Sequence, residues 1–200
     1  MKLPGPSGTV LLSMVLEPSL ASRARAMPTS EDVHSLYVAY AAELRLTLSR
    51  LSGNLVDPDD LLHEVFVVAL RNTAELARAN SARAWLYGVA TKVAATRRRG
   101  ARLRRFFGLE LAEHHPSPES PLRSLEQKEA SEQISKALEG LSAAKREVFV
   151  LFELQQLKGE EISQALAIPL KTVWTRLFHA RRDLATELER LQKLDRGRDA

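Results

Sequence analysis

KGEEISQALAIPLKTVWTRLFHARRDL, residues 158–184, predicts two helices joined by a tight turn. We expect the first helix over about Glu160–Ala167. It should end there because Pro169 disfavours the helical conformation for the residue before it. The second helix is expected to begin near Lys171, where apolar residues return at intervals of three and four and form one buried stripe: Val173, Leu177, Ala180 and Leu184.

The other faces of that second helix are basic and polar, which is typical of a helix-turn-helix. Such a helix fits the major groove of DNA, with its N-terminal residues near base edges and its basic side chains near phosphates. The candidate recognition surface comprises Lys171, Thr172, Trp174, Thr175, Arg176, His179 and Arg182. Two amphipathic helices around a proline can also pack together without a DNA-binding role, so the spacing alone leaves that alternative open.

Composition favours an all-helical protein of one domain or two small ones. The chain has 200 residues, of which 44% are hydrophobic, and glycine and proline are few. It has no cysteine, which excludes disulfides and thiolate metal sites. No metal site is expected either, because the adjacent His114 and His115 lack further ligands nearby and His63 lacks a second histidine four residues away.

The N-terminal segment carries a short apolar run, residues 9–16. That run is too short to span a bilayer, and its flanks fit a signal peptide poorly. We therefore expect residues 1–28 to form a poorly ordered extension and no membrane insertion. Whether translation starts at Met27 stays open.

The first half of the chain predicts three helices, the first over about residues 29–51. Asp57 caps the second, with Pro58 at its first position, where the missing N–H costs nothing. The start of this helix is acidic, with Asp57, Asp59, Asp60 and Glu64. Capping accounts for part of that acidity, and a surface for contact with another protein is the second interpretation.

The third helix, over residues 82–99, follows a predicted loop with a short helical turn at residues 72–81. Arginines crowd its end and the segment beyond: Arg97, Arg98, Arg99, Arg102, Arg104 and Arg105. Between Arg71 and Arg105 the only acid is Glu75. Such a dense cluster of positive charges would neutralise a polyanion such as DNA. A basic face that is simply solvated is the alternative.

Three segments, in order, resemble the extracytoplasmic-function (group IV) sigma factors of RNA polymerase. Residues 57–66, DPDDLLHEVF, resemble their core-polymerase-binding segment. Residues 83–87, RAWLY, with the arginines that follow, resemble their promoter-melting and minus-ten segment, and residues 141–184 resemble their minus-thirty-five domain. The chain departs from the family pattern at His63, Leu70, Thr91, Lys92, Ala167 and Trp174.

The resemblance implies an all-α protein of two small helical domains joined by a flexible linker. Sigma region 2 would span residues 29–105, the linker 106–125, and sigma region 4 with its helix-turn-helix 126–193, before a charged tail at 194–200. It further implies a cytoplasmic, non-enzymatic protein without cofactors that binds RNA polymerase core and directs promoter recognition, melting and initiation. A cognate anti-sigma factor is expected as a partner.

The resemblance also assigns residues to surfaces. The polymerase-binding set is Asp57, Asp59, Asp60, Leu61, His63 and Glu64. The minus-ten set is Asn80, Arg83, Lys92, Arg97, Arg98, Arg99 and Arg102. Trp85 and Tyr87 invite a base-stacking role, with Trp85 more consistent with the core, and Phe66 is expected in the core. In the recognition helix, Thr175 and Arg176 are the leading DNA contacts.

Two other functions fit the sequence less well. A stand-alone helix-turn-helix regulator would leave the acidic second helix and the arginine-rich third helix unexplained. A nucleic-acid enzyme would need a carboxylate cluster for a metal, or a nucleophile with a base, and the sequence offers neither beyond the capping acids.

Overall fold

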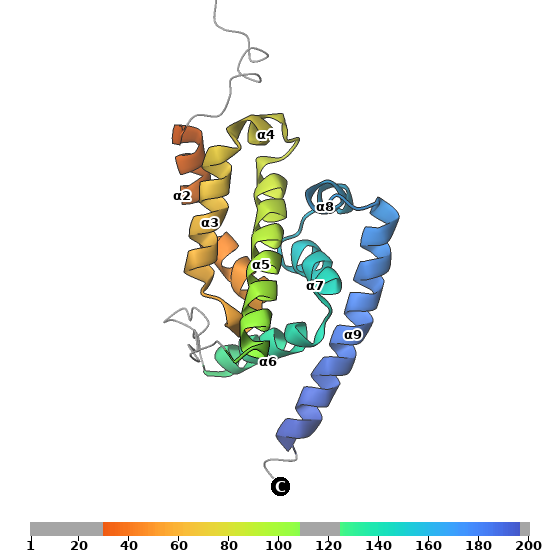
Figure 1. The fold of residues 1–200 in the computed structure, drawn as a ribbon. Coiled ribbons are helices and arrows are strands. Elements are labelled where there is room, and N and C mark those ends of the chain that lie inside the picture. Colours follow the sequence, from red (N-terminus) through yellow and green to blue (C-terminus); the bar gives the residue numbers. More distant parts are fainter. Residues whose placement is uncertain (1–29, 109–124, 197–200) are drawn as a thin grey trace, which may run out of the picture.

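The computed structural model describes residues 30–108 and 125–196, and every regular element within them is helical (Figure 1). This confirms the all-α prediction. The predicted N-terminal extension, most of the predicted linker with His114 and His115, and residues 197–200 of the charged tail lie outside the described residues.

The first half of the chain packs around one central helix. Its elements are α2 (Ser30–Ser52), η1 (Gly53–Leu55), α3 (Pro58–Arg71), α4 (Thr73–Arg78) and α5 (Ala82–Phe106). Both α2 and α3 pack against α5 and against each other (Figure 1). Leucines at helical spacing, such as Leu44, Leu48 and Leu61, are fully buried, so apolar burial holds the three helices together. Phe66 is 6% exposed, as expected of a core residue.

The predicted cap of α3 forms, and α5 has a cap of its own. The Asp57 carboxylate accepts a hydrogen bond from the Asp59 N–H at 2.8 Å, with Pro58 at the first position of α3. The Ser81 hydroxyl accepts one from the Ala84 N–H at 3.1 Å and begins α5. This helix continues to Phe106, beyond the predicted end at Arg99, because arginine, leucine and alanine are strong helix formers.

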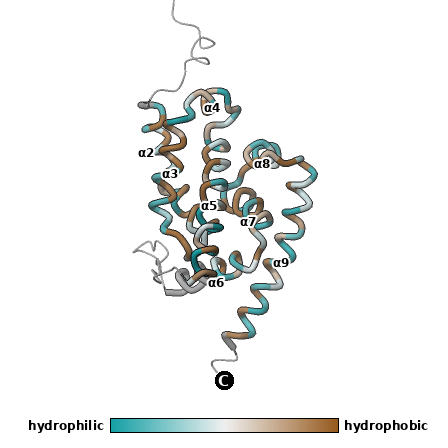
Figure 2. The backbone as a smooth tube through the Cα atoms, in the orientation of Figure 1, coloured by the Kyte–Doolittle hydropathy of each residue, from teal (hydrophilic) through white to brown (hydrophobic). Residues whose placement is uncertain are grey.

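The second half forms a compact group of helices with a long final helix. Its elements are α6 (Leu125–Gly140), α7 (Ala143–Phe149), the π-helical turn η2 (Val150–Leu154), α8 (Gly159–Leu166) and α9 (Leu170–Arg196). Helices α6, α7 and α8 all pack on α9. Figure 2 shows polar and apolar residues interspersed along α9, which is the pattern of a helix that packs along one stripe. Val173, Leu177 and Ala180 are buried, as predicted.

The turn between α8 and α9 has its own hydrogen bonds. Ala167 adopts a left-handed conformation, with φ of 52°. The Ser163 carbonyl accepts the N–H of Ile168 at 3.0 Å, and the Ser163 hydroxyl donates to the Ile168 carbonyl at 2.6 Å. These bonds satisfy groups left free at the end of α8, and the chain turns into α9 two residues later. The paired helices around Pro169 match the prediction.

The two halves also pack directly against each other, through α5 and α8 (Figure 1). Gly88 lies so close to α8 that a Cβ atom there would sit 2.7 Å from the Ala165 carbonyl oxygen. Nearby, the Tyr87 hydroxyl donates to the Gln155 side-chain oxygen at 2.8 Å. Sequence reasoning predicted two domains on a tether, and the structure shows them docked.

Candidate nucleic-acid interface

The first turns of α9 hold the candidate recognition residues at different depths. Lys171, Trp174, Thr175 and Arg182 are exposed, while Thr172, Arg176 and His179 are half-buried. The Thr175 hydroxyl donates to the Lys171 carbonyl at 2.9 Å, so it is engaged within the helix. The exposed part of this face therefore offers one lysine, one arginine and an indole to a polyanion.

Trp174 also packs within the helix-turn-helix itself. Its ring covers Gly159 so closely that a Cβ atom there would lie 2.6 Å from the indole Cζ2. The ring meets Phe152 edge to face, with centroids 5.5 Å apart. Although 44% of Trp174 is exposed, these contacts brace α8 and η2 against α9. Sequence reasoning assigned Trp174 to DNA alone and missed this packing role.

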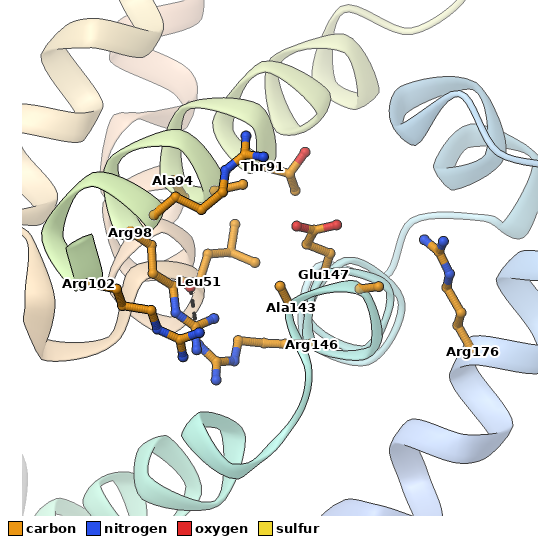
Figure 3. Close-up of a pocket in the computed structure, with 12 residues that line it drawn as sticks. Leu51, Thr91, Ala94, Arg98, Arg102, Ala143, Arg146, Glu147 and Arg176 are labelled. Atoms are coloured by element: carbon orange, nitrogen blue, oxygen red, sulfur yellow. Dashed lines mark hydrogen bonds between the residues drawn. The ribbon is translucent and has the colours of Figure 1, made fainter. Parts of the chain in front are cut away.

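Arg176 points from α9 toward α7 rather than away from the protein (Figure 3). It lies near Glu147, whose pKa is raised mainly by burial, while Arg176 opposes that rise. Arg181, one turn along α9, makes an ion pair with Glu153 at 2.6 Å. Arg181 is thus held by a carboxylate of η2, and Arg176 lies within the electrostatic reach of a carboxylate of α7.

The predicted minus-ten residues at the start of α5 face the second half of the chain. The Asn80 amide donates to the Gln164 side-chain oxygen at 3.3 Å. The Arg83 guanidinium donates to the Gln155 carbonyl at 2.7 Å and lies 3.4 Å from Glu43. In this arrangement both side chains are occupied by contacts within the protein.

The two aromatic residues near the start of α5 are not equivalent. Tyr87 is completely buried, and burial is the main cause that raises its pKa. Its ring is enclosed between the two halves, so the base-stacking role considered for it does not fit this structure. Trp85 is half-buried and packs against the core, which agrees with the core interpretation.

The arginine-rich end of α5 is mixed in exposure. Arg99 and Arg102 are exposed, as is Lys92 two to three turns earlier. Arg97 is paired with Glu64 of α3 at 2.7 Å. Arg98 is only 6% exposed, and burial is the first cause that lowers its pKa. The structure therefore presents most of this predicted surface but removes Arg98 from it.

The acidic start of α3 is accessible. Asp60 and His63 are exposed and Glu64 is half-buried. Asp59 is exposed too, but Arg45 donates two hydrogen bonds to its carboxylate, at 2.5 and 2.7 Å, and these lower its pKa. Leu61, which the resemblance placed in the polymerase-binding set, is fully buried in the core and supports this surface from beneath.

Arg146 is a residue that sequence reasoning missed. It is 1% exposed and donates to three backbone carbonyls, those of Leu138 at 2.6 Å, Leu141 at 3.2 Å and Leu51 at 3.3 Å. Burial, reinforced by the charge of Arg98, lowers its pKa to about 10. The only sequence signal was its place one turn before Phe149 and Val150, on a stripe of buried apolar residues.

Across residues 30–108 and 125–196, no group of three or more potential metal-ligating side chains comes together. None of the helices in those ranges is both long enough and apolar enough to cross a membrane.

Comparison with known proteins adds an independent line of evidence. Residues 36–104 match the family described as Sigma-70 region 2, and residues 131–184 match the family described as Sigma-70, region 4. The RNA polymerase sigma factor YlaC of Bacillus subtilis (strain 168) is 27% identical over 172 residues, covering 85% of this chain and 99% of that protein.

Two solved structures share the fold. One is the sigma factor RpoE in complex with the anti-sigma factor NepR from Bartonella quintana, with a TM-score of 0.64 at 21% identity. The alignment covers 80% of this chain and 98% of RpoE. The other is CnrH in complex with the cytosolic domain of CnrY, with a TM-score of 0.59 at 21% identity, covering 84% of this chain and 94% of CnrH.

Proposed function

This chain belongs to the sigma-70 family of RNA polymerase sigma factors, in the extracytoplasmic-function group, and from that premise we propose how its surfaces are divided between polymerase and promoter. Proteins of this family bind core RNA polymerase and direct it to promoters to initiate transcription. They are initiation factors rather than enzymes, and we propose that this chain likewise has no catalytic activity of its own.

The observation that carries the proposal is the separation of exposed charge by element. Exposed carboxylates gather at the start of α3, with Asp59 and Asp60 at the surface, whereas the exposed charges at the end of α5 are arginines. Carboxylates suit a basic protein partner, and guanidiniums suit phosphate. We therefore assign the start of α3, with Asp57, His63 and Glu64, to core polymerase.

The DNA contacts are assigned to two surfaces. Residues of α5 and the segment before it would meet the minus-ten region, and the first three turns of α9 would meet the minus-thirty-five region. The exposed cations Lys92, Arg99, Arg102, Lys171 and Arg182 support this assignment directly. Asn80 and Arg83 are included on condition that α8 and Gln155, which follows η2, move away from α5. Gln164 and Gln155 hold these two side chains in the docked arrangement.

The remaining assignments concern domains and partners. We propose that residues 29–105 act as region 2 and 126–193 as region 4, with promoter melting as part of the first domain's role. A cognate anti-sigma factor is proposed as a further partner, supported by the RpoE relative that was solved with one. Because core polymerase is the partner, the chain is proposed to act in the cytoplasm.

The test is in-vitro transcription with purified core polymerase and this chain. Asp60→Lys should weaken core binding, because Asp60 is exposed and has no ion pair within the described chain. Glu189→Lys on α9 makes the same charge change at an exposed position away from α3 and should leave core binding unchanged. Binding of core polymerase by the two variants with equal affinity would rule out the α3 assignment, and DNA binding without polymerase association would favour a stand-alone regulator.

A further inference from the structure

A cavity of about 370 Å³ lies where α5, α7 and α9 meet, and nearly all of its charged lining residues are arginines (Figure 3). The five arginines that line it are Arg98, Arg99 and Arg102 of α5, Arg146 of α7 and Arg176 of α9. Among the described lining residues, the single carboxylate is that of Glu147. A cavity with five bases and one acid carries a strong positive potential.

Arg98 is the clearest anomaly in this cavity. It is 6% exposed, its Nε is fully enclosed, and within residues 30–108 and 125–196 it has no hydrogen bond or ion pair. A buried charge without a partner is costly, so buried guanidiniums are ordinarily paired. Here a buried donor lacks an acceptor and lies beside a space large enough for a ligand.

Arg146 adds a second buried positive charge at the same place. Its donors meet backbone carbonyls only, so no carboxylate neutralises it at contact distance. Figure 3 shows the guanidinium groups of Arg98, Arg102 and Arg146 gathered together on one side of the cavity. The carboxylates of Glu139 and Glu147 favour the charged form of Arg98 and Arg146 from beyond hydrogen-bonding distance. The neighbouring arginines disfavour that charged form by repulsion. An anion would relieve this repulsion.

We propose that this cavity binds a small anion with two or more phosphate groups, such as pyrophosphate or a free nucleotide, and that the bound anion holds α5 against α7 and α9. The planar guanidinium matches phosphate oxygens in a two-pronged fashion, which makes clustered arginines a phosphate site. The cavity volume falls in the range of small-molecule sites. A DNA duplex does not fit, because elements of both halves wall the cavity.

The consequence rests on the function proposed above. Since both halves supply the walls, the anion binds the docked arrangement and shifts the population toward it. In that arrangement Asn80 and Arg83, the proposed promoter contacts, are held by Gln164 and Gln155. The anion therefore acts as an inhibitor that stabilises a form poorly suited to DNA.

The experiment is calorimetric titration of the full-length chain with inorganic pyrophosphate, against sulfate at the same ionic strength, with neither DNA nor polymerase present. Pyrophosphate should bind, and sulfate should bind much more weakly. Arg102→Gln removes an exposed arginine of the lining and should weaken pyrophosphate binding by about tenfold or more, the loss of one charged phosphate contact. Arg104→Gln, an exposed arginine on the same helix outside the cavity, is the matched control and should leave affinity unchanged.

Arg176→Gln is the second variant, because it tests the α9 wall of the cavity at a half-buried position on a different helix from Arg102. It should also weaken pyrophosphate binding. The proposal is overturned if pyrophosphate and sulfate bind alike, if the Arg102 and Arg104 variants lose affinity equally, or if Arg176→Gln binds as the unaltered chain does. It is likewise overturned if Arg102→Gln lowers affinity for a DNA duplex, measured in a separate titration, but leaves affinity for pyrophosphate unchanged. If the unaltered chain fails to support transcription by core polymerase when no pyrophosphate is added, that result counts against the proposed function instead.

Discussion

Gly88→Ala should separate the two halves without harming either one. In the docked arrangement the new methyl group would lie 2.7 Å from the Ala165 carbonyl oxygen and 3.1 Å from its Cα and Cβ atoms. These contacts are shorter than a Cβ atom tolerates, and a backbone oxygen cannot swing aside. Overpacking of this kind costs about 1–3 kcal/mol. A coupling free energy of that size changes the docking equilibrium by about 5- to 150-fold.

The undocked form gains from the same substitution. Alanine is favoured over glycine by about 0.8–1.0 kcal/mol inside a helix, and the described atoms nearest to Gly88 all belong to Ala165. Gly100→Ala is the matched control on the same helix, since its methyl group would meet only the Arg104 Nη1, at 3.6 Å. Gly100→Ala should therefore give the same gain in helix stability without a steric clash against α8.

The assay is energy transfer between two dyes on the full-length chain. Because the sequence has no cysteine, single cysteines at the exposed positions Ala39 on α2 and Ala185 on α9 can be labelled uniquely. Gly88→Ala should lower the transfer efficiency and raise affinity for a promoter duplex, because Asn80 and Arg83 become free. If Gly88→Ala and Gly100→Ala gave the same transfer efficiency and the same duplex affinity, the inhibitory docking described here would be refuted.

Four further results are expected. Ala167→Gly should stabilise the chain by about 0.5–1 kcal/mol in urea denaturation, because the left-handed backbone at this position penalises alanine by about 1–2 kcal/mol. The greater backbone freedom of glycine in the unfolded chain offsets part of that gain. A lower free energy of unfolding for the variant would contradict this. Arg146→Met should destabilise by about 1.5–3 kcal/mol in the same assay, because it leaves three backbone carbonyls without a charged donor. The pKa of Asp59 is lowered by its hydrogen bond to Arg45, so this ion pair stabilises the fold above the unfolded-state pKa, and the stabilisation is lost as pH falls through the folded-state pKa. Asp59→Asn should therefore cost no more than about 1 kcal/mol at pH 7, discounted for exposure, and progressively less in acid, as measured by urea denaturation at a series of pH values. Arg176→Ala should weaken promoter binding by about 1–3 kcal/mol if it reads a base, and an unchanged preference for the upstream element, measured by competition, would remove it from the interface.

The helices were predictable because their signals are local. The periodic apolar residues of α9, the Asp57–Pro58 start of α3 and the break at Pro169 each act within a few residues of chain, and each appears where the sequence placed it. The exceptions concern helix length, since α5 runs to Phe106 through a segment whose composition favours helix but whose apolar period has faded. The exposed acids of α3 were equally readable, because charge that no core can bury must lie at the surface.

Contacts between the two halves were not predictable in this way. Sequence alone determined the helices, the sorting of charge along the chain and the helix-turn-helix. Tertiary structure alone decided that the backbone of α8 packs against Gly88 and that Tyr87 is enclosed between the two halves. It also decided that Arg98 and Arg146 are buried side by side. The reason is physical: a periodic pattern reports which face of a helix avoids water, but the partner of that face depends on packing between residues far apart in the chain, where no local preference acts.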